Sequence, residues 1–221
     1  MLRCMSEIIR RNNQMHFIFN ILVSISLLLF PISASRYIRK VWNIFLSNRF
    51  SRQIGSSKSI YLETPFYVRG YQYIHIGECF SSGPGFRIEC WDKYQKDLYN
   101  PSITIGNNVC FNYRCHVGAI NKIIIGDNVL IGSQVLITDH SHGESTKEEL
   151  GVSPAKRKLY SKGPVIIGDN VWIGEGACIL SNVTIGNNSI IGANSVVTHD
   201  VPPFCVVGGN PAKIIRQLND I

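Results

Sequence analysis

Residues 165–201 read VIIGDNVWIGEGACILSNVTIGNNSIIGANSVVTHDV, and six-residue units account for nearly all of this stretch. A unit starts with an aliphatic residue, usually followed by Gly, continues with two mostly polar residues, and has a small or branched residue in fifth place. Ile167 and Ile185 are eighteen residues apart, so three units make one turn of the chain. A short fixed period is typical of a solenoid, whose units stack because none can bury its apolar face alone.

The repeating unit predicts an all-β solenoid with three flat sides. The aliphatic residue faces inward, the fifth residue is small because it also faces the narrow interior, and Gly or Asn turns the corner, since both tolerate positive φ. Interrupted units continue the pattern upstream to Ile103, with a slip at residues 120–122 that predicts a small bulge, and residues 74–77 predict an irregular first coil. A β-sandwich of short strands, the alternative, does not explain the regular period.

Basic residues lie in groups outside the regular units. The chain has 22 Lys and Arg against 15 Asp and Glu, a formal charge of +7. The groups are Arg36, Arg39, Lys40, Arg49 and Arg52; Lys156, Arg157 and Lys158; and Lys213 and Arg216. Such an excess suits nucleic acid, anionic lipid or a polyanionic small molecule. No nucleic-acid-binding motif accompanies these groups, so we do not expect a nucleic-acid partner.

The cysteines argue for a reducing compartment. The seven form an odd set without a CxxC pair: Cys4, Cys79, Cys90, Cys110, Cys115, Cys178 and Cys205. Cys115 occupies a small inward position of its unit, where a thiol packs as a compact apolar group. We therefore expect a cytoplasmic protein without a disulfide framework.

The most hydrophobic run, residues 17–32 (FIFNILVSISLLLFPI), precedes the repeats. Three interpretations stay open: a membrane-associated or inserted helix, a helix buried against the prism, and a signal peptide ending near Ser33-Ala34-Ser35. More Lys and Arg follow the run than precede it, so an inserted helix would leave the repeats at the inner face of the cytoplasmic membrane. We expect three segments: 1–60 hydrophobic and basic, 61–201 the prism with an extruded loop at 138–164, and 202–221 a tail with a short helix.

The repeat stops after Ile137, where the chain reads Thr138-Asp139-His140-Ser141-His142-Gly143, and resumes at Val165. A long loop on a rigid scaffold is a favoured place for function. Imidazole titrates near neutrality, so a histidine at the loop root can act as general base toward a hydroxyl. The same residues also fit solvated loop histidines, or a metal site made from His140, His142 and Asp139, although no third strong ligand has recognisable spacing.

The repeats, this loop root, the phrase Val171-Trp172-Ile173-Gly174 and the ending Gly208-Gly209-Asn210-Pro211-Ala212-Lys213-Ile214-Ile215-Arg216 resemble the hexapeptide-repeat acyltransferases. The most similar branch holds the maltose and galactoside O-acetyltransferases and the O-acetyltransferases of lipopolysaccharide and capsule gene clusters. The resemblance covers residues 74–218. It implies a left-handed parallel β-helix that forms a homotrimer, with active sites between neighbouring prisms. It also implies acetyl-CoA as acyl donor, with direct transfer to a hydroxyl and no metal.

The resemblance also implies roles for single residues. A count without gaps from Gly126 puts His142 at the family's catalytic position, and a shifted loop root would put His140 there; we expect His142. Asn112, Asp139 and Trp172 are candidates for binding the acceptor. Trp172, Gly174 and Ala193 match positions beside the pantetheine arm and thioester, and Lys213 and Arg216 match a basic pair near the nucleotide end of CoA. A spacing of three would put that pair on one face of a C-terminal helix.

These expectations lead to two classes of function. The first is an acetyl-CoA-dependent O-acetyltransferase that modifies a sugar hydroxyl of a surface polysaccharide, O-antigen or capsule, or its precursor. The hydrophobic run in place of the soluble relatives' N-terminal segment favours a saccharide or lipid-linked saccharide handled near a membrane. The second is a non-catalytic hexapeptide-repeat scaffold, or a metal-binding protein similar to the γ-carbonic anhydrases.

Overall fold

The computed structural model describes residues 15–27, 32–144 and 146–218. It divides into two compact units, Met1–Trp42 and Asn43–Ile221. The larger unit contains three sheets, here called A, B and C. Sheet A contains β1 (Ile60–Leu62), β4 (Phe80–Ser82), β9 (Cys110–Phe111), β12 (Leu130–Ile131), β17 (Trp172–Ile173), β20 (Ile190–Ile191), β22 (Cys205–Gly208) and β23 (Lys213–Gln217). Sheet B contains β2 (Phe66–Arg69), β5 (Phe86–Cys90), β10 (His116–Ala119), β13 (Leu136–Thr138), β18 (Cys178–Ile179) and β21 (Val196–Val197). Sheet C contains β3 (Ile74–Ile76), β8 (Ser102–Ile105), β11 (Lys122–Ile125), β16 (Val165–Ile167) and β19 (Val183–Ile185).

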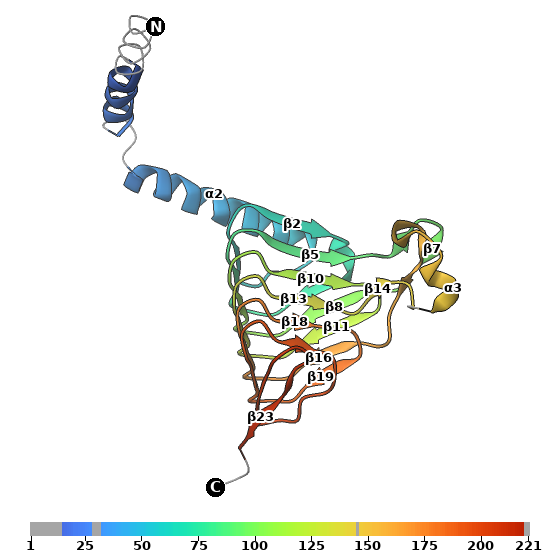
Figure 1. Ribbon diagram of the computed structural model, residues 1–221. Helices are drawn as coiled ribbons and strands as arrows, with labels where there is room; N and C mark the ends of the chain where they lie inside the picture. The colour runs from blue at the N-terminus through green and yellow to red at the C-terminus, as the bar shows by residue number, and fades with distance from the viewer. Residues whose placement is uncertain (1–14, 28–31, 145, 219–221) are drawn as a thin grey trace, which may run out of the picture. The chain divides into compact units, whose positions relative to one another are not determined.

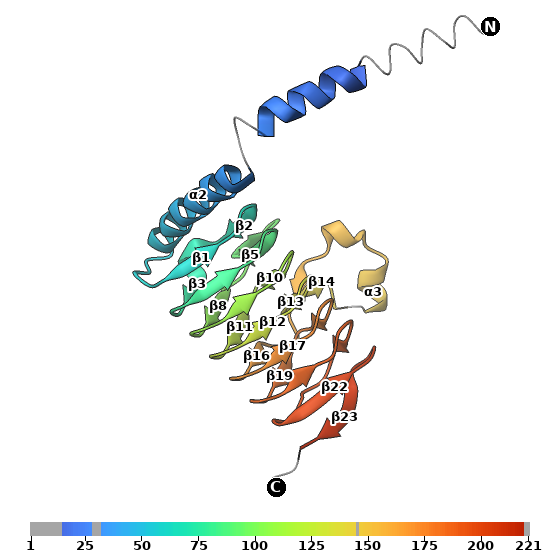
Figure 2. The same ribbon diagram turned by 90° about the vertical axis from the view of Figure 1, so that its left-hand side faces the viewer.

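Each complete turn of the chain contributes one strand to each sheet, in the order A, B, C, and then starts the next turn. In the last turn, β20 and β21 are followed by an isolated bridge between Val201 and Ile185 in place of a sheet C strand. Every strand pair in the three sheets is parallel except β22–β23. The result is a parallel β-helix whose coils are stacked in sequence order (Figure 2). This confirms three units per turn, and shows that strands begin at Ile60, earlier than the irregular coil expected at residues 74–77.

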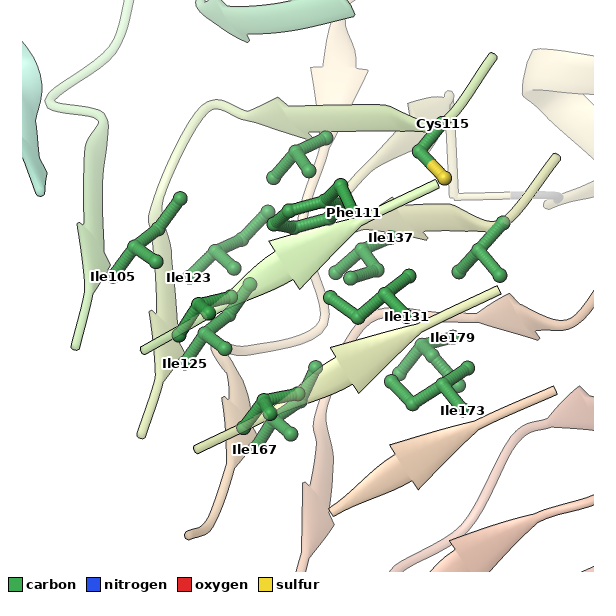
Figure 3. Close-up of a cluster of buried hydrophobic side chains, with 14 of the residues drawn as sticks. Ile105, Phe111, Cys115, Ile123, Ile125, Ile131, Ile137, Ile167, Ile173 and Ile179 are labelled. Carbon is green, nitrogen blue, oxygen red and sulfur yellow. The ribbon is translucent and has the colours of Figure 1, made fainter. Parts of the chain in front are cut away.

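The interior is filled by the first and fifth residues of each unit, as the repeat predicts. Ile105, Ile125 and Ile167 occupy matching positions of sheet C in successive coils and lie one above another (Figure 3). Their small partners in fifth place are also buried: Val109, Cys115, Val129, Val135, Val171, Ala177, Val183, Ser189 and Ser195. Because each buried aliphatic side chain contributes about 1.5–3 kcal/mol, stacking supplies a continuous stabilising core.

Polar residues of the Gly-Asp-Asn type join neighbouring coils at the corner between sheets C and A. Asp127 Oδ1 accepts a hydrogen bond from Asn107 N–H at 2.6 Å, and Asp169 Oδ1 accepts one from Asp127 N–H at 2.8 Å. The last residue of each corner has positive φ, 57° at Asn128 and 56° at Asn170. These polar residues therefore have a structural role, and the repeat itself carries no chemistry.

Helix α2 (Ile32–Gln53) covers the first coil with its Asn43–Gln53 part. Asn43 Oδ1 accepts hydrogen bonds from Thr64 N–H at 3.1 Å and from its hydroxyl at 2.7 Å. Phe50 is buried, with its ring 6.4 Å from that of Phe66. Each end of a stacked core needs such a cap, because the coil at that end would otherwise expose its apolar side chains to solvent.

The N-terminal unit contains the helix Met15–Leu27 and the start of α2. Within the described residues no single helix is long and apolar enough to cross a membrane. The two helices meet the criteria of length and composition only as a bent pair. Part of the hydrophobic run, residues 28–31, lies outside the described residues, as does the basic segment before residue 15.

Two expectations about elements are corrected. The predicted C-terminal helix is wrong: residues 213–217 form strand β23, antiparallel to β22. The slip at residues 120–122 is not a bulge within a strand, since it falls at the corner between β10 and β11. Both segments are short, so the spacing of their side chains does not determine their conformation. Backbone pairing with the adjacent strands determines it instead.

Candidate active site

Two excursions leave the corner between sheets B and C and contact each other beside the prism. The first, residues 91–101, forms the hairpin β6 (Lys93–Tyr94) and β7 (Asp97–Leu98). The second is the predicted loop, with β14 (Ser141–His142), α3 (Lys147–Leu150), the 3₁₀ turn Pro154–Lys156 and β15 (Leu159–Tyr160). Tyr94 donates its hydroxyl hydrogen to Ala155 O at 2.9 Å, and Leu159 N–H donates to Tyr99 Oη at 2.9 Å. Figure 1 shows β7 and α3 on the same side of the prism.

Asp139 and His140 form a carboxylate–imidazole pair at the loop root. Asp139 is 0% exposed; its Oδ1 accepts from Ile120 N–H at 2.9 Å and its Oδ2 from Asn121 N–H at 2.8 Å. His140 Nδ1 lies 3.0 Å from Asp139 Oδ1, with the His140 side chain 15% exposed. We assign the proton on Nδ1 from this contact, which leaves Nε2 as the acceptor. A histidine held in this way can take a proton from a hydroxyl.

The burial of Asp139 corrects its expected role in substrate binding. Both carboxylate oxygens of Asp139 accept hydrogen bonds from backbone N–H groups, and Oδ1 also contacts the His140 ring. The residue is fully buried, so a ligand cannot reach it. Asp139 instead orients His140 and closes the corner at Ile120–Asn121.

His140 borders a pocket of about 310 Å³ between the loop root and the next coils. The pocket is lined by Thr138, His140, Ser141, Gly143, Glu144, Tyr160, Lys162, Leu180, Ser181, Asn182 and Thr198. A larger pocket of about 470 Å³ lies between the two excursions, and its lining contains no histidine. Proton transfer to a histidine is therefore supported at the smaller pocket.

His142 has a different environment from His140. It lies on β14, is exposed, and packs against the edge of the Tyr94 ring with centroids 5.5 Å apart. It does not line the pocket at His140. The two histidines of the loop root therefore differ in both burial and partner.

The remaining candidates lie on other parts of the prism. Trp172 is on the outer face of sheet A and 52% exposed, so within one chain it is on a different side from the loop root. Asn112 and Ala193 lie at the corner between sheets A and B, as does Gly174. A Cβ at Gly174 would lie 2.5 Å from Ala193 N, so Gly174 lets neighbouring coils approach.

Lys213 and Arg216 lie on exposed strand β23 and still share one face. Lys213 pairs with Gly208 and Arg216 with Val206, and the register of the ladder shifts between Val206 and Val207. Directly opposed residues point to the same side of a sheet, and Val206 and Gly208 are two residues apart. The register shift therefore produces the placement that we attributed to a helix.

Thiol and metal chemistry find little support at this site. Burial, followed by the charges of Asp139 and Asp92, raises the pKa of Cys90 to about 12, and burial raises the pKa of Cys115 to about 11. Both thiols are therefore protonated near neutral pH. Among the side chains that the structure describes, no group of three or more His, Cys, Asp or Glu could hold a metal ion.

The sequence did not single out two features near His140. Hairpin 91–101 replaces a corner of the prism, and its signal was the failure of the repeat between Cys90 and Ile103. Glu89, buried at 2% exposure, contacts both Arg87 and His116 one coil away from Thr138. No sequence pattern marks this cluster, because its members belong to different strands.

A parallel β-helix of hexapeptides with a carboxylate-held histidine at an extruded loop defines a class of acyl-transferring enzymes. Two family models match the chain: the bacterial transferase hexapeptide (six repeats) over residues 164–199, and the hexapeptide repeat of succinyl-transferase over residues 122–137. The putative lipopolysaccharide biosynthesis O-acetyl transferase WbbJ of Escherichia coli K12 is 35% identical over 187 residues, 83% of this chain and 89% of that protein. The chain belongs to the hexapeptide-repeat acetyltransferase family and is an acetyltransferase.

Two further relatives agree with this assignment. Galactoside O-acetyltransferase of Escherichia coli K12 is 39% identical over 127 residues, 55% of this chain and 57% of that protein. The hexapeptide-repeat acetyltransferase VCA0836 of Vibrio cholerae is 26% identical in a solved structure with a TM-score of 0.50, covering 79% of this chain and 90% of that chain. VCA0836 has also been solved in complex with acetyl coenzyme A.

Proposed function

We propose that the chain is an acetyl-CoA-dependent O-acetyltransferase that modifies a sugar hydroxyl of a surface polysaccharide or its precursor, with His140 as general base. The observation that carries the mechanism is the Asp139–His140 pair, in which the carboxylate holds Nδ1 of a histidine that lines a pocket. The similarity to a lipopolysaccharide O-acetyl transferase supports the acceptor class.

The reaction follows from this arrangement. His140 Nε2 takes the proton of the acceptor hydroxyl while its oxygen attacks the thioester carbonyl of acetyl-CoA. The tetrahedral intermediate collapses, the carbon–sulfur bond breaks, and the imidazolium returns its proton to the leaving thiolate. The products are the acetyl ester and CoA with a free thiol. Asp139 stabilises the imidazolium and keeps the ring in place; backbone N–H groups stabilise the oxyanion.

The choice of His140 over His142 rests on preorganisation. A general base must be held in position, and a buried carboxylate holds His140 whereas an exposed aromatic contact accompanies His142. This assignment corresponds to the shifted loop root rather than to the count without gaps. His142 is left with packing against the hairpin as its role.

We propose that the active form is a homotrimer of left-handed prisms with the sites between chains. Within one chain His140 follows sheet B, while Trp172 and the Lys213/Arg216 pair belong to sheet A. Trp172 pairs in register with Leu130 and Ile190, which gives sheet A an outer apolar column. Burial of this column against the loop side of a neighbouring copy would bring both halves together. Family resemblance supports the left hand.

We also propose that the N-terminal helices associate with the inner face of the cytoplasmic membrane. Helix Met15–Leu27 has exposed apolar side chains and no Asp, Glu, Lys or Arg, and α2 carries five basic residues and no acidic one. Exposed apolar side chains with neighbouring basic residues suit an anionic lipid surface. Flotation of the full chain with phosphatidylglycerol vesicles, weakened by salt, is the expected result; equal binding to phosphatidylcholine vesicles, or none, contradicts it.

The test of catalysis compares His140→Ala with His142→Ala in the purified full chain. The acceptors are a panel of nucleotide-sugars and oligosaccharides, with acetyl-CoA as donor. We expect a fall in kcat of about 10²- to 10⁴-fold for His140→Ala, and a small change for His142→Ala. A loss confined to His142→Ala would return the role to His142, and unchanged transfer in both would refute the mechanism.

A second measurement addresses the non-catalytic scaffold. Millimolar acetyl-CoA should raise the Tm of the wild-type chain by mass action. No rise, together with no transfer to any saccharide in the panel, would favour the scaffold, and stoichiometric zinc in the purified protein would favour the metal-binding alternative.

A further inference from the structure

A second carboxylate–imidazole pair lies on the outer face of sheet B, with His116 one coil and Glu89 two coils before strand β13, which leads to His140. His116 Nε2 lies 3.0 Å from Glu89 Oε2, and an Arg87 guanidinium nitrogen lies 2.6 Å from the same oxygen. Burial raises the pKa of the Glu89 carboxyl, but the hydrogen bonds and charges of His116 and Arg87 outweigh it and lower that pKa overall. Glu89 is therefore a carboxylate at neutral pH.

The two pairs share a small space above Gly118. The strand register places Gly118 directly between Glu89 on β5 and Thr138 on β13. A Cβ at Gly118 would lie 3.3 Å from His116 Nε2 and 3.5 Å from His140 Cε1. Both imidazole rings thus border the same gap, and the missing side chain of Gly118 keeps it open.

The fold does not explain why a carboxylate occupies this position. Glu89 points to the outside of the prism, where the corresponding residues of successive strands are Arg69, Gly118 and Thr138. Removing a carboxylate from water costs free energy unless its partners compensate for the loss, and here Arg87 and His116 supply that compensation. A buried charge of this kind beside a reactive group is more common at functional sites than in structural positions.

One oxygen of Glu89 remains available. Both Arg87 and His116 use Oε2, and Oε1 has no hydrogen bond to any residue within the described ranges. Within the described residues, Ser82 Oγ is the one fully buried side-chain polar atom without a hydrogen-bond partner. Oε1 of Glu89 does not belong to that group, so it is not fully buried. Oε1 therefore keeps some contact with solvent and can accept a hydrogen bond from a ligand.

We propose that Glu89, held by His116 and Arg87, binds a second hydroxyl of the acceptor sugar while His140 deprotonates the first. This inference rests on the proposed O-acetyltransferase function and adds the residue that selects the hydroxyl. With one hydroxyl fixed at Glu89, the sugar ring can present only particular neighbours to His140 Nε2. Arg87 and His116 act through Glu89 and are positioning residues.

The chemistry of the pair defines the acceptor. A carboxylate only accepts hydrogen bonds, so the subsite takes a free hydroxyl and disfavours a deoxy, methylated or already acetylated position. The acceptor is therefore a sugar residue with at least two free hydroxyls near each other. Once one is acetylated, the product no longer offers both groups, so a single acetyl group per sugar residue is expected.

The decisive variant is Glu89→Gln, which keeps the shape and removes the charge, with Glu78→Gln as matched control. Glu78 is exposed and contacts Lys58 at 3.8 Å on another corner of the prism. The acceptor is the saccharide that the wild-type chain acetylates in the panel above. We expect KM for this saccharide to rise about 10- to 100-fold in Glu89→Gln, with a much smaller change in KM for acetyl-CoA, and wild-type values in Glu78→Gln.

Monodeoxy analogues of the same saccharide provide a second measurement. One of them should lose activity with the wild-type chain and lose nothing further with Glu89→Gln, because the carboxylate and the missing hydroxyl report one contact. If Glu89→Gln does not fold, as judged by its Tm, Glu89→Asp keeps the charge at a shorter reach and should raise KM for the saccharide in the same way.

The outcomes separate this inference from the proposed function. A wild-type chain that acetylates no saccharide refutes the proposed function before Glu89 is varied. A wild-type chain that transfers acetyl while Glu89→Gln keeps its acceptor KM overturns this inference alone. Equal loss of acetyl-CoA hydrolysis and of transfer in Glu89→Gln, with a lowered Tm, would show a purely structural role and also overturn it.

Discussion

Asp139 serves the fold and the active site through the same two oxygens. It accepts hydrogen bonds from Ile120 and Asn121 N–H and holds His140 Nδ1. The loop histidine is therefore fixed by a group that cannot move without opening a corner of the prism. Stability and catalysis should respond together when Asp139 is replaced, and separately when His140 is.

Replacing Asp139 with Ala should lower both the free energy of unfolding and kcat. The Ile120 and Asn121 N–H groups would lose their acceptor, at about 1–3 kcal/mol for the buried Ile120 N–H, and the His140 ring would lose its orientation. His140→Ala, the matched control, should lose kcat with a much smaller change in stability. Urea denaturation and single-turnover assays on both variants measure the two effects, and a stable, active Asp139→Ala protein would contradict the structural account.

The Glu89 cluster should make stability depend on pH below the usual carboxyl range. The native pKa of Glu89 is lowered, so its ionised form is stabilised in the folded chain. That stabilisation is fully present above the unfolded pKa near 4.3 and is lost as pH falls through the native pKa. The difference in unfolding free energy between wild type and Glu89→Gln should thus shrink below about pH 4.3; a difference independent of pH would contradict this.

The thiols should differ sharply in reactivity. Cys90 and Cys115, with pKa values raised to about 12 and about 11, should resist alkylation in the native protein. Cys79 is exposed and should react first. Mass spectrometry after brief iodoacetamide treatment at pH 7.5 measures the order, and unfolding in urea, the control, should make all three reactive. Early labelling of Cys90 would mean that the corner beside Asp139 opens.

At the level of elements, β23 shows where a sequence pattern reaches its limit. Residues 213–217 (KIIRQ) are too few to distinguish a period of 3.6 from one of 2. The decisive fact is that β22 ends with an unpaired edge, to which the returning chain pairs with a shifted register. The same-face placement of Lys213 and Arg216 was predicted for the wrong reason.

The basic pair on β23 should affect the donor and leave chemistry intact. We expect Lys213→Ala and Arg216→Ala each to raise KM for acetyl-CoA about 3- to 30-fold, the size of one charge-assisted phosphate contact, with little change in kcat. Lys122→Ala, at an exposed position on sheet C away from the pocket at His140, is the control. Added salt screens the charges of this pair, so it should raise the KM of the wild-type chain for acetyl-CoA toward the values of the two variants. An unchanged KM in both variants would remove the pair from the donor site.

The loop and hairpin show the other limit. The interruption after Ile137 was visible in the sequence, and the structure confirms a loop there; the interruption between Cys90 and Ile103 was equally visible and was not interpreted. What no repeat reveals is contact between them, such as Tyr94 with Ala155. Two excursions can touch only if they leave the same corner of the prism. Each excursion can be assigned to a corner only after every strand has been assigned to its coil and sheet.

At the scale of the whole molecule, the prism could be predicted because every coil buries the same positions of its six-residue units. Ile167 and Val171 report inward positions by their spacing alone, and the structure buries both. The candidate site could be predicted only as a region: the loop root was identified, while the partner of His140, the burial of Asp139 and the Glu89 cluster required strands from different coils to be aligned.

A trimer with sites between chains makes a prediction that a single chain cannot satisfy. Inactive His140→Ala and Trp172→Ala chains, refolded together, should regain activity, because mixed trimers contain a site with both wild-type halves. Random mixing of equal amounts should restore about a quarter of wild-type activity, whereas each variant alone stays inactive. Absence of recovery, with mixed trimers verified by two affinity tags, would contradict a site shared by His140 of one chain and Trp172 of its neighbour.

The corner ladder of Asn107, Asp127 and Asp169 fixes one coil on the next without slack. Because parallel strands lie about 4.8 Å apart, the height of any outward side chain along the prism is a whole number of such steps. In the proposed trimer, a donor that reaches from the loop to β23 must therefore span the fixed number of coils between them. That distance can change only by an entire turn of the prism, which is eighteen residues long between Ile167 and Ile185.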